Sequence, residues 1–185
     1  KHNDNRLTAG DIGFHFLIKT LSEGGKSQLL YDMNARNDIP GYGYQLKKGA
    51  TALTESFQAL ESVSHNHFML GHLMEWFYTG LACIRQKNGS SGFKEIEIKP
   101  EMVDDVKYAK TEHFSPYGNI VSEWYKNNNE LKMIVDIPVN TTAQVFIPST
   151  PDQKLIESGK RISSQNNIKI IGPYENGMVF CLGSG

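Results

Sequence analysis

Apolar residues recur at helical spacing over the first half of the chain and predict a series of helices there. Residues 10–21 carry apolar side chains three to four positions apart, and Gly24 follows them as a stop signal. Ser27 is the expected N-cap of a second helix. Residues 50–60 can form a further helix.

The most apolar segment, residues 64–84, predicts one long helix. Its apolar residues nearly surround the helix axis: Phe68, Met69, Leu70, Leu73, Met74, Trp76, Phe77, Leu81 and Ile84. A helix that is apolar on most sides is normally buried among other elements. A few neighbouring helices would leave it incompletely covered, so we expect exposed apolar surface centred on this segment.

The period of the apolar residues changes from helical to two beyond a polar Gly/Ser stretch at residues 85–92. The clearest case is residues 131–139, where only Ile134 breaks the alternation. Similar short runs occur at residues 94–98, 119–125, 143–147, 168–171 and 178–182. Short, regularly spaced strands with turn residues between them predict an antiparallel β-sandwich. The sequence therefore divides into a helical part, residues 1–87, and a β part, residues 88–185.

Composition and charge exclude several classes of partner. Lys and Arg number 19 against 20 Asp and Glu, so the chain offers no basic surface for nucleic acid or an anionic membrane. No apolar run approaches the roughly 20 residues of a membrane span. No signal peptide is visible either, and nothing separates a periplasmic, extracellular or cytoplasmic location.

Candidate chemistry gathers between residues 42 and 67. Glu55 has no ionic partner nearby in the sequence, although a glutamate in such a position is usually solvated surface. His67 follows Asn66 at the start of the apolar segment, where a helix N-terminus favours the neutral ring. A neutral histidine donates one hydrogen bond and accepts another, as a sugar hydroxyl requires. The alternative role is a polar cap on a buried helix.

Aromatic and metal-ligand residues complete the candidate set. Tyr42 and Tyr44 lie in a Pro-Gly-rich segment that predicts a loop with two exposed tyrosines, whose flat faces fit the C–H face of a sugar. Core packing is the commoner use of such rings. His65, His67, His72 and Glu75 are candidate metal ligands, but His65 and His67 would point to different sides of a helix. We therefore expect no metal.

Three blocks stand in order and close together: PGYGYQLKKGA at 40–50, ATALTESF at 50–57 and SHNHFMLGHLMEWFYTGL at 64–81. The series resembles the closing signature of the α-L-rhamnosidases of glycoside hydrolase family 78. That family shows a Pro-Ser-Trp-Gly-Tyr type loop, then Gly-Ala-Thr-Thr-x-Trp-Glu, then Asn-His-Tyr followed by Gly-Glu-Trp-Leu-Tyr. LTAGDIGFHFLIKTL at 7–21 resembles its upstream helix start, and FKEIEIKP, SPYGNIVSEW and CLGSG resemble its C-terminal sandwich.

The resemblance implies an α+β multidomain fragment: the last helices of a six-hairpin (α/α) toroid followed by an antiparallel β-sandwich. It implies an inverting enzyme that releases terminal α-L-rhamnose, with Glu55 as general base. His67 and Asn66 would bind the sugar, and Tyr42 and Tyr44 would lie at the rim of its pocket. No metal or organic cofactor is implied.

The chain also departs from the family pattern. Thr54 replaces the family's tryptophan before the glutamate, and Ser56 and Phe57 replace the Arg-Trp after it. The family's Asp-x-x-x-Arg-x-Glu segment, which supplies the general acid, does not occur here, although inversion needs two carboxyl groups. We therefore expect a fragment that is inactive alone and that is completed by the N-terminal part of the same enzyme or covered by a second copy. The rival interpretation is a non-catalytic carbohydrate-binding or structural module that works through its sandwich.

Overall fold

The chain forms two compact units in the computed structural model, which describes residues 4–150, 152–162 and 168–185. The first unit comprises residues up to Leu81 together with Glu101–Asp105, and the second comprises Ala82–Pro100 and Val106–Gly185. The chain thus leaves the first unit, returns to it for five residues and leaves it again. The boundary expected at residues 87 and 88 stays a prediction.

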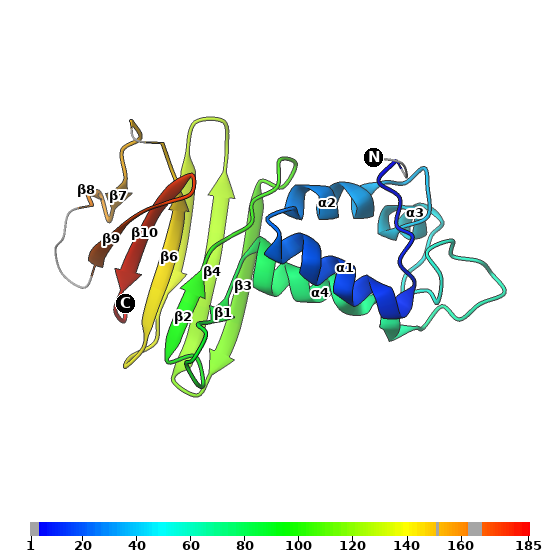
Figure 1. Ribbon diagram of the computed structural model, residues 1–185, viewed down its shortest axis with the longest axis horizontal. Helices are drawn as coiled ribbons and strands as arrows, with labels where there is room; N and C mark the ends of the chain where they lie inside the picture. Colours follow the sequence, from blue (N-terminus) through cyan, green and yellow to red (C-terminus); the bar gives the residue numbers. More distant parts are fainter. Residues whose placement is uncertain (1–3, 151, 163–167) are drawn as a thin grey trace. The chain divides into compact units, whose positions relative to one another are not determined.

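The first unit is helical (Figure 1). Its elements are α1 (Asp11–Glu23), α2 (Ser27–Ala35), α3 (Tyr42–Lys47) and a continuous final helix made of η1 (Phe68–His72), α4 (Leu73–Trp76) and the π-helical η2 (Phe77–Leu81). Helix α1 packs against α2 on one side and against η1 and α4 on the other. Among the described residues, no helix combines the length and the apolar character that a bilayer span requires.

The apolar residues of α1 divide between a covered and an uncovered face. Phe14 and Ile18 are buried, whereas Ile12 and Phe16 are 72% and 64% exposed. The helix that the sequence predicts at residues 10–21 is present, but these two of its apolar side chains face outward. The apolar period therefore predicts where the helix lies, but it does not predict which of its apolar faces is buried by other residues of this chain.

The final helix shows the same division and is shorter than the sequence indicates. It buries Leu70, Leu73 and Trp76, while Phe68 and Met74 are 82% and 56% exposed. The expectation of uncovered apolar side chains on this segment is therefore confirmed. The expectation that the helix begins at residue 64 is wrong, since the residues before Phe68 hydrogen-bond to an earlier part of the chain.

A carboxylate anchors the buried indole of this helix. Trp76 Nε1 donates a hydrogen bond to Ser27 Oγ at 2.8 Å and lies 3.2 Å from Glu101 Oε2. The hydroxyls of Ser22 and Ser27 both donate to the same carboxylate. Ser27 is the first residue of α2 and not its N-cap, which is Lys26. The prediction for Ser27 is wrong because its hydroxyl is engaged by Glu101.

The second unit is built from two main sheets and a small ribbon. Their strands are β1 (Arg85–Gln86), β2 (Glu95–Ile98), β3 (Tyr108–Ser115), β4 (Gly118–Lys126), β5 (Leu131–Asp136), β6 (Thr142–Pro148), β7 (Ile156–Glu157), β8 (Lys160–Arg161), β9 (Ile168–Tyr174) and β10 (Gly177–Leu182). One sheet has the order β1-β2-β6-β10-β9, the other has β3-β4-β5, and β7 pairs with β8. All pairings are antiparallel except β2 with β6.

Both main sheets contribute to one core. Ile96 and Ile98 of β2 and Val145 of β6 pack with Ile120 of β4 and with Ile137, which follows β5. Alternate residues of these strands point inward, which is the geometry behind the period of two in the sequence. The predicted α+β architecture, helices followed by a mainly antiparallel β-sandwich, is present (Figure 1).

Candidate active site

Residues 53–67 form a closed loop, which we call the Glu55 loop. Its two ends are joined by backbone hydrogen bonds from His67 N–H to Leu53 O at 2.9 Å and from Glu55 N–H to Ser64 O at 2.8 Å. The helix predicted at residues 50–60 is therefore wrong, because these long-range bonds take up backbone groups that a helix would pair locally. The result is a compact surface loop whose neck brings the glutamate beside the histidine segment.

The carboxylate of Glu55 is exposed but tethered. Its Oε2 accepts a hydrogen bond from the backbone N–H of Ser64 at 3.2 Å, which adds a side-chain contact to the backbone bond between the same two residues. Within the part of the chain that the structure describes, Oε1 accepts no hydrogen bond. One oxygen of Glu55 thus fixes the side chain, and the other is available to bind a water molecule.

His67 and its surroundings hold polar atoms that the described residues leave without partners. These atoms are His67 Nε2, Ser56 Oγ and the Tyr42 hydroxyl, and all three are buried. Leaving a buried polar group unpaired costs about 1–3 kcal/mol, so such atoms normally have a partner. The three atoms on or beside the Glu55 loop are therefore candidates to bond to water or to a bound ligand.

Tyr42 belongs to an aromatic cluster that includes Phe57 of the Glu55 loop. Its ring lies 5.9 Å from that of Phe57, and both contact Phe14, at 5.9 and 5.3 Å between ring centroids. Burial raises the pKa of the Tyr42 phenol well above its usual range, so the hydroxyl stays neutral. The prediction of an exposed loop is wrong here, since Tyr42 and Tyr44 are half-buried and begin helix α3.

Tyr44 and Asn66 are not drawn into the same contacts. The ring of Tyr44 lies 5.6 Å from Lys48 Nζ, and residues two apart on a helix do not face each other, which separates it from Tyr42. Asn66 is exposed, and its backbone N–H donates to Ser64 Oγ at 3.2 Å. The structure therefore places Glu55 and His67 on one loop and the ring of Tyr42 against Phe57 of that loop, whereas Tyr44 and Asn66 make separate contacts. The functional roles of all five residues stay predictions.

The residues that sequence reasoning missed are those that hold the loop. Thr54 is fully buried, and its hydroxyl donates to Ser56 O at 2.6 Å, while Ser64 supplies both backbone partners of Glu55. A threonine and a serine in a polar segment that lacks an apolar period are the one signal that could have indicated these turns.

The candidate metal ligands His65, His72 and Glu75 make separate contacts in the structure. The ring of His72 lies 5.0 Å from that of His15, and His15 Nδ1 lies 3.3 Å from Glu75 Oε2. The ring of His65 instead contacts Leu60 O at 3.0 Å. Over the described ranges, no group of three or more His, Cys, Asp or Glu residues is arranged to hold a metal ion.

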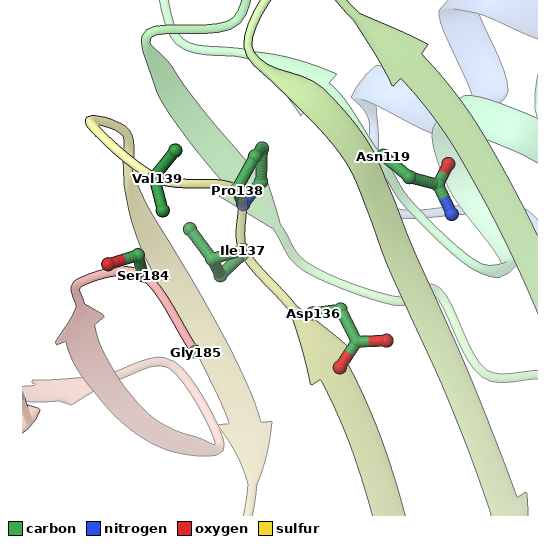
Figure 2. Close-up of a pocket in the computed structure, with 7 residues that line it drawn as sticks. All are labelled: Asn119, Asp136, Ile137, Pro138, Val139, Ser184 and Gly185. Atoms are coloured by element: carbon green, nitrogen blue, oxygen red, sulfur yellow. The ribbon is translucent and has the colours of Figure 1, made fainter.

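The second unit contains an open hollow of about 480 Å³ (Figure 2). Its lining residues are Asn119, Asp136, Ile137, Pro138, Val139, Ser184 and Gly185. Figure 2 shows Asp136 and Asn119 on the opposite side from Ser184 and Val139. Of the lining residues, Asp136 alone carries a side-chain carboxylate, so the hollow does not supply the two carboxyl groups of a glycosidase.

Two family models match successive parts of the chain. Residues 1–81 match the bacterial α-L-rhamnosidase six-hairpin glycosidase domain, and residues 84–162 match the bacterial α-L-rhamnosidase C-terminal domain. An α-L-rhamnosidase of Formosa agariphila is 29% identical over 91% of this chain and 19% of its own length. One of Streptomyces avermitilis is 29% identical over 81% of this chain and 15% of its own length. The chain thus spans less than a fifth of the length of these relatives.

Solved structures agree with this relationship. The α-L-rhamnosidase from Dictyoglumus thermophilum is 28% identical and aligns with a TM-score of 0.85 over the whole of this chain and 21% of its own. The Streptomyces avermitilis α-L-rhamnosidase complexed with L-rhamnose, 24% identical, aligns with a TM-score of 0.81 over the whole of this chain and 18% of its own, which shows the shared fold. The chain belongs to the bacterial α-L-rhamnosidase family, with residues 1–81 matching its six-hairpin glycosidase domain and residues 84–162 matching its C-terminal domain.

Proposed function

We propose that this chain is the C-terminal part of an inverting glycosidase that releases terminal α-L-rhamnose, and that Glu55 is its general base. The observation that carries the proposal is the neck of the Glu55 loop, where an exposed carboxylate is fixed through one oxygen beside the segment that ends in His67. Membership of the family supplies the substrate class, and the loop supplies one of the two chemical groups.

In the proposed reaction, Glu55 Oε1 takes a proton from a water molecule as that water attacks the anomeric carbon. The sugar oxygen leaves from the opposite face and receives a proton from a general acid, so the configuration inverts. Inverting enzymes place their two carboxyl groups about 6.5–9.5 Å apart to leave room for the water. His67, through its unpaired Nε2, and the Tyr42 hydroxyl would bind sugar hydroxyls, with Asn66 and Tyr44 as outer contacts.

The general acid would come from upstream of Lys1, in the part of the parent enzyme that this chain does not span. The chain alone would then bind sugar weakly and would not hydrolyse it, since it provides the base without the acid. The N-terminal part of the same enzyme would also cover the exposed apolar side chains of α1 and the final helix. A second copy of the chain is the alternative cover for the same side chains.

A carbohydrate-binding role for the sandwich is the second candidate, and the open hollow beside Asp136 is the observation that favours it (Figure 2). The lining of the hollow combines the apolar side chains of Ile137 and Pro138 with the polar side chains of Asp136 and Asn119. The two functions differ in where rhamnose binds. Chemical-shift changes on titration with L-rhamnose would map either to the Glu55 loop or to Asp136 and Asn119.

The test of the enzymatic proposal is Glu55→Gln in the intact parent enzyme. General base catalysis typically contributes about 10²–10⁴-fold, so kcat should fall by that factor while KM changes little. Added azide should restore turnover and give the inverted glycosyl azide, because an anion that needs no deprotonation replaces the water. Initial rates on an aryl rhamnoside, with NMR of the product anomer, measure both effects.

Glu61→Gln is the matched control, since Glu61 is an exposed glutamate in the same loop. It should leave kcat and KM unchanged. His67→Ala should differ from both by weakening the ground state and the transition state together, so that its loss appears partly in KM. A Glu55→Gln enzyme with near-normal kcat would remove Glu55 from the chemistry.

A further inference from the structure

We infer that Thr54 is a positioning residue for Glu55, whose hydroxyl holds the backbone of the Glu55 loop in the shape that presents the carboxylate. The inference rests on the proposed role of Glu55 as general base. Thr54 itself touches no reacting atom, because it is fully buried with a relative exposure of 0%.

The position of Thr54 in the neck explains its burial. It lies between Leu53, which accepts a hydrogen bond from His67, and Glu55, which donates one to Ser64. Thr54 is fully buried, whereas the next residue, Glu55, is exposed, so the threonine faces the interior of the unit while the carboxylate faces solvent.

The hydroxyl of Thr54 then spans Glu55. It donates to Ser56 O at 2.6 Å, across the residue that carries the carboxylate. The Glu55 N–H is already held by Ser64 O at 2.8 Å, and Oε2 by Ser64 N–H at 3.2 Å. The backbone on both sides of Glu55 and one carboxylate oxygen are thus fixed, which leaves Oε1 in a defined place. No charged group takes part in the backbone restraint, so it does not depend on pH.

The test compares Thr54→Val, which keeps the shape and removes the donor, with Thr54→Ser, which keeps the donor and removes a methyl group. In the intact enzyme, Thr54→Val should lower kcat about 10- to 100-fold with KM within about threefold, because small displacements of a catalytic group cost up to about 10²-fold. Thr54→Ser should retain kcat within about threefold. Thr51→Val, an exposed threonine three residues earlier, is the control and should match the wild type.

Rates are expressed per folded enzyme, with folding checked by circular dichroism and thermal melting. If Thr54→Val does not fold, Thr54→Ala carries the same comparison, since it lacks the hydroxyl and adds no bulk. Failure of both to fold overturns the inference, because the hydroxyl then serves folding and not the placement of Glu55. Equal kcat losses in the valine and serine variants, or a loss confined to KM, overturn it as well.

The Glu55→Gln enzyme separates this inference from the proposed function. If Glu55→Gln abolishes turnover while Thr54→Val is normal, Glu55 remains the base and Thr54 has no positioning role. If Glu55→Gln is near normal, the proposed function fails first, and Thr54 has no catalytic group to position.

Discussion

Arg36 forms ion pairs with two carboxylates of the first unit, those of Asp38 and Asp4. The contact changes the pKa of Asp38. Its Nη2 lies 2.6 Å from Asp38 Oδ2, and its Nη1 lies 3.2 Å from Asp4 Oδ2. The hydrogen bond to Arg36 lowers the pKa of Asp38 from 3.8 to about 2. A carboxyl group whose pKa is lower in the folded state stabilises the fold above its unfolded pKa, near 3.8, and that contribution is lost as the pH falls through about 2.

The titration of Asp38 can therefore be shifted by one substitution. Arg36→Gln should raise the Asp38 pKa from about 2 towards 3.8, as followed by NMR of the side-chain carboxyl. Arg6→Gln, at an exposed arginine, is the control and should leave the titration unchanged. An Asp38 midpoint near 3.8 in the unsubstituted chain would contradict the ion pair. Because both side chains are accessible to solvent, the effect on the free energy of unfolding should be small.

At the residue scale, the sequence indicates the candidate catalytic and sugar-binding residues, but it does not indicate the hydrogen bonds that hold these residues in place. Glu55 and His67 stand out through the resemblance of their segments to a family. The bonds from Glu55 to Ser64 and from His67 to Leu53 join residues nine and fourteen positions apart. Local propensity does not encode such pairings, which is why residues 50–60 predict a helix and form a loop. Thr54 is a case in point, since its buried hydroxyl has meaning only in the closed loop.

Among the elements, α3 depends on a glycine that allows two segments to approach. A Cβ at Gly43 would lie 2.5 Å from Ala35 O and Arg36 O, at the end of α2. Gly13, in the first turn of α1, is the opposite case, since its Cβ would meet Ala9 Cβ at 3.4 Å in ordinary contact. Glycine is thus required for close packing in α3, whereas in α1 the structure has room for a side chain at Gly13.

Alanine substitutions at these two positions should have opposite signs. Gly13→Ala should raise the free energy of unfolding by about 0.5–1 kcal/mol, the usual gain on replacing a helical glycine. Gly43→Ala should lower it by about 1–3 kcal/mol, because backbone atoms must move. Urea denaturation of the chain, followed by far-UV circular dichroism, measures both. A stabilising Gly43→Ala would show that α2 and α3 do not approach this closely.

The strands show which patterns a sequence can reveal. Strands β2, β4, β5, β6, β9 and β10 coincide with runs of period two. Strand β3 was missed because its inward residues include Ala109, Thr111 and Ser115, which are buried but small or polar, so no apolar alternation appears. Its pairing with β4 along the full strand defines it instead. The parallel pairing of β2 with β6 cannot be predicted from the local sequence pattern either, because it joins segments that are far apart in the chain.

For the whole molecule, the main feature is apolar surface that the chain leaves uncovered. In the first unit the exposed apolar side chains are Ile12, Phe16, Leu46, Leu60, Phe68, Met74, Phe77 and Tyr78. The second unit exposes Phe114 on β3 to a similar degree as Phe68, at 84% against 82%. These two phenylalanines provide a matched pair, one on the proposed contact with upstream helices and one on the sandwich.

Phe68→Ser should therefore have a different effect in the isolated chain and in the intact enzyme. In the isolated chain it should reduce association, measured by light scattering, because it removes exposed apolar surface. In the intact enzyme it should lower the free energy of unfolding by about 2 kcal/mol or more, since burying a phenylalanine contributes about 1.5–3 kcal/mol. Phe114→Ser should share the first effect and lack the second. Equal stability of the two intact variants would contradict upstream cover of Phe68.

Because Glu101–Asp105 belongs to the helical unit, one cut in the chain cannot separate the helical unit from the β unit with both complete. The chain passes between the units at residues 81, 100 and 105, so a single proteolytic nick cannot release either one. Loss of Glu101 would remove the carboxylate that accepts hydrogen bonds from Ser22 and Ser27, while Trp76 would keep its hydrogen bond to Ser27. Truncating or exchanging the β unit at residue 81 would therefore deprive the helical unit of this acidic anchor.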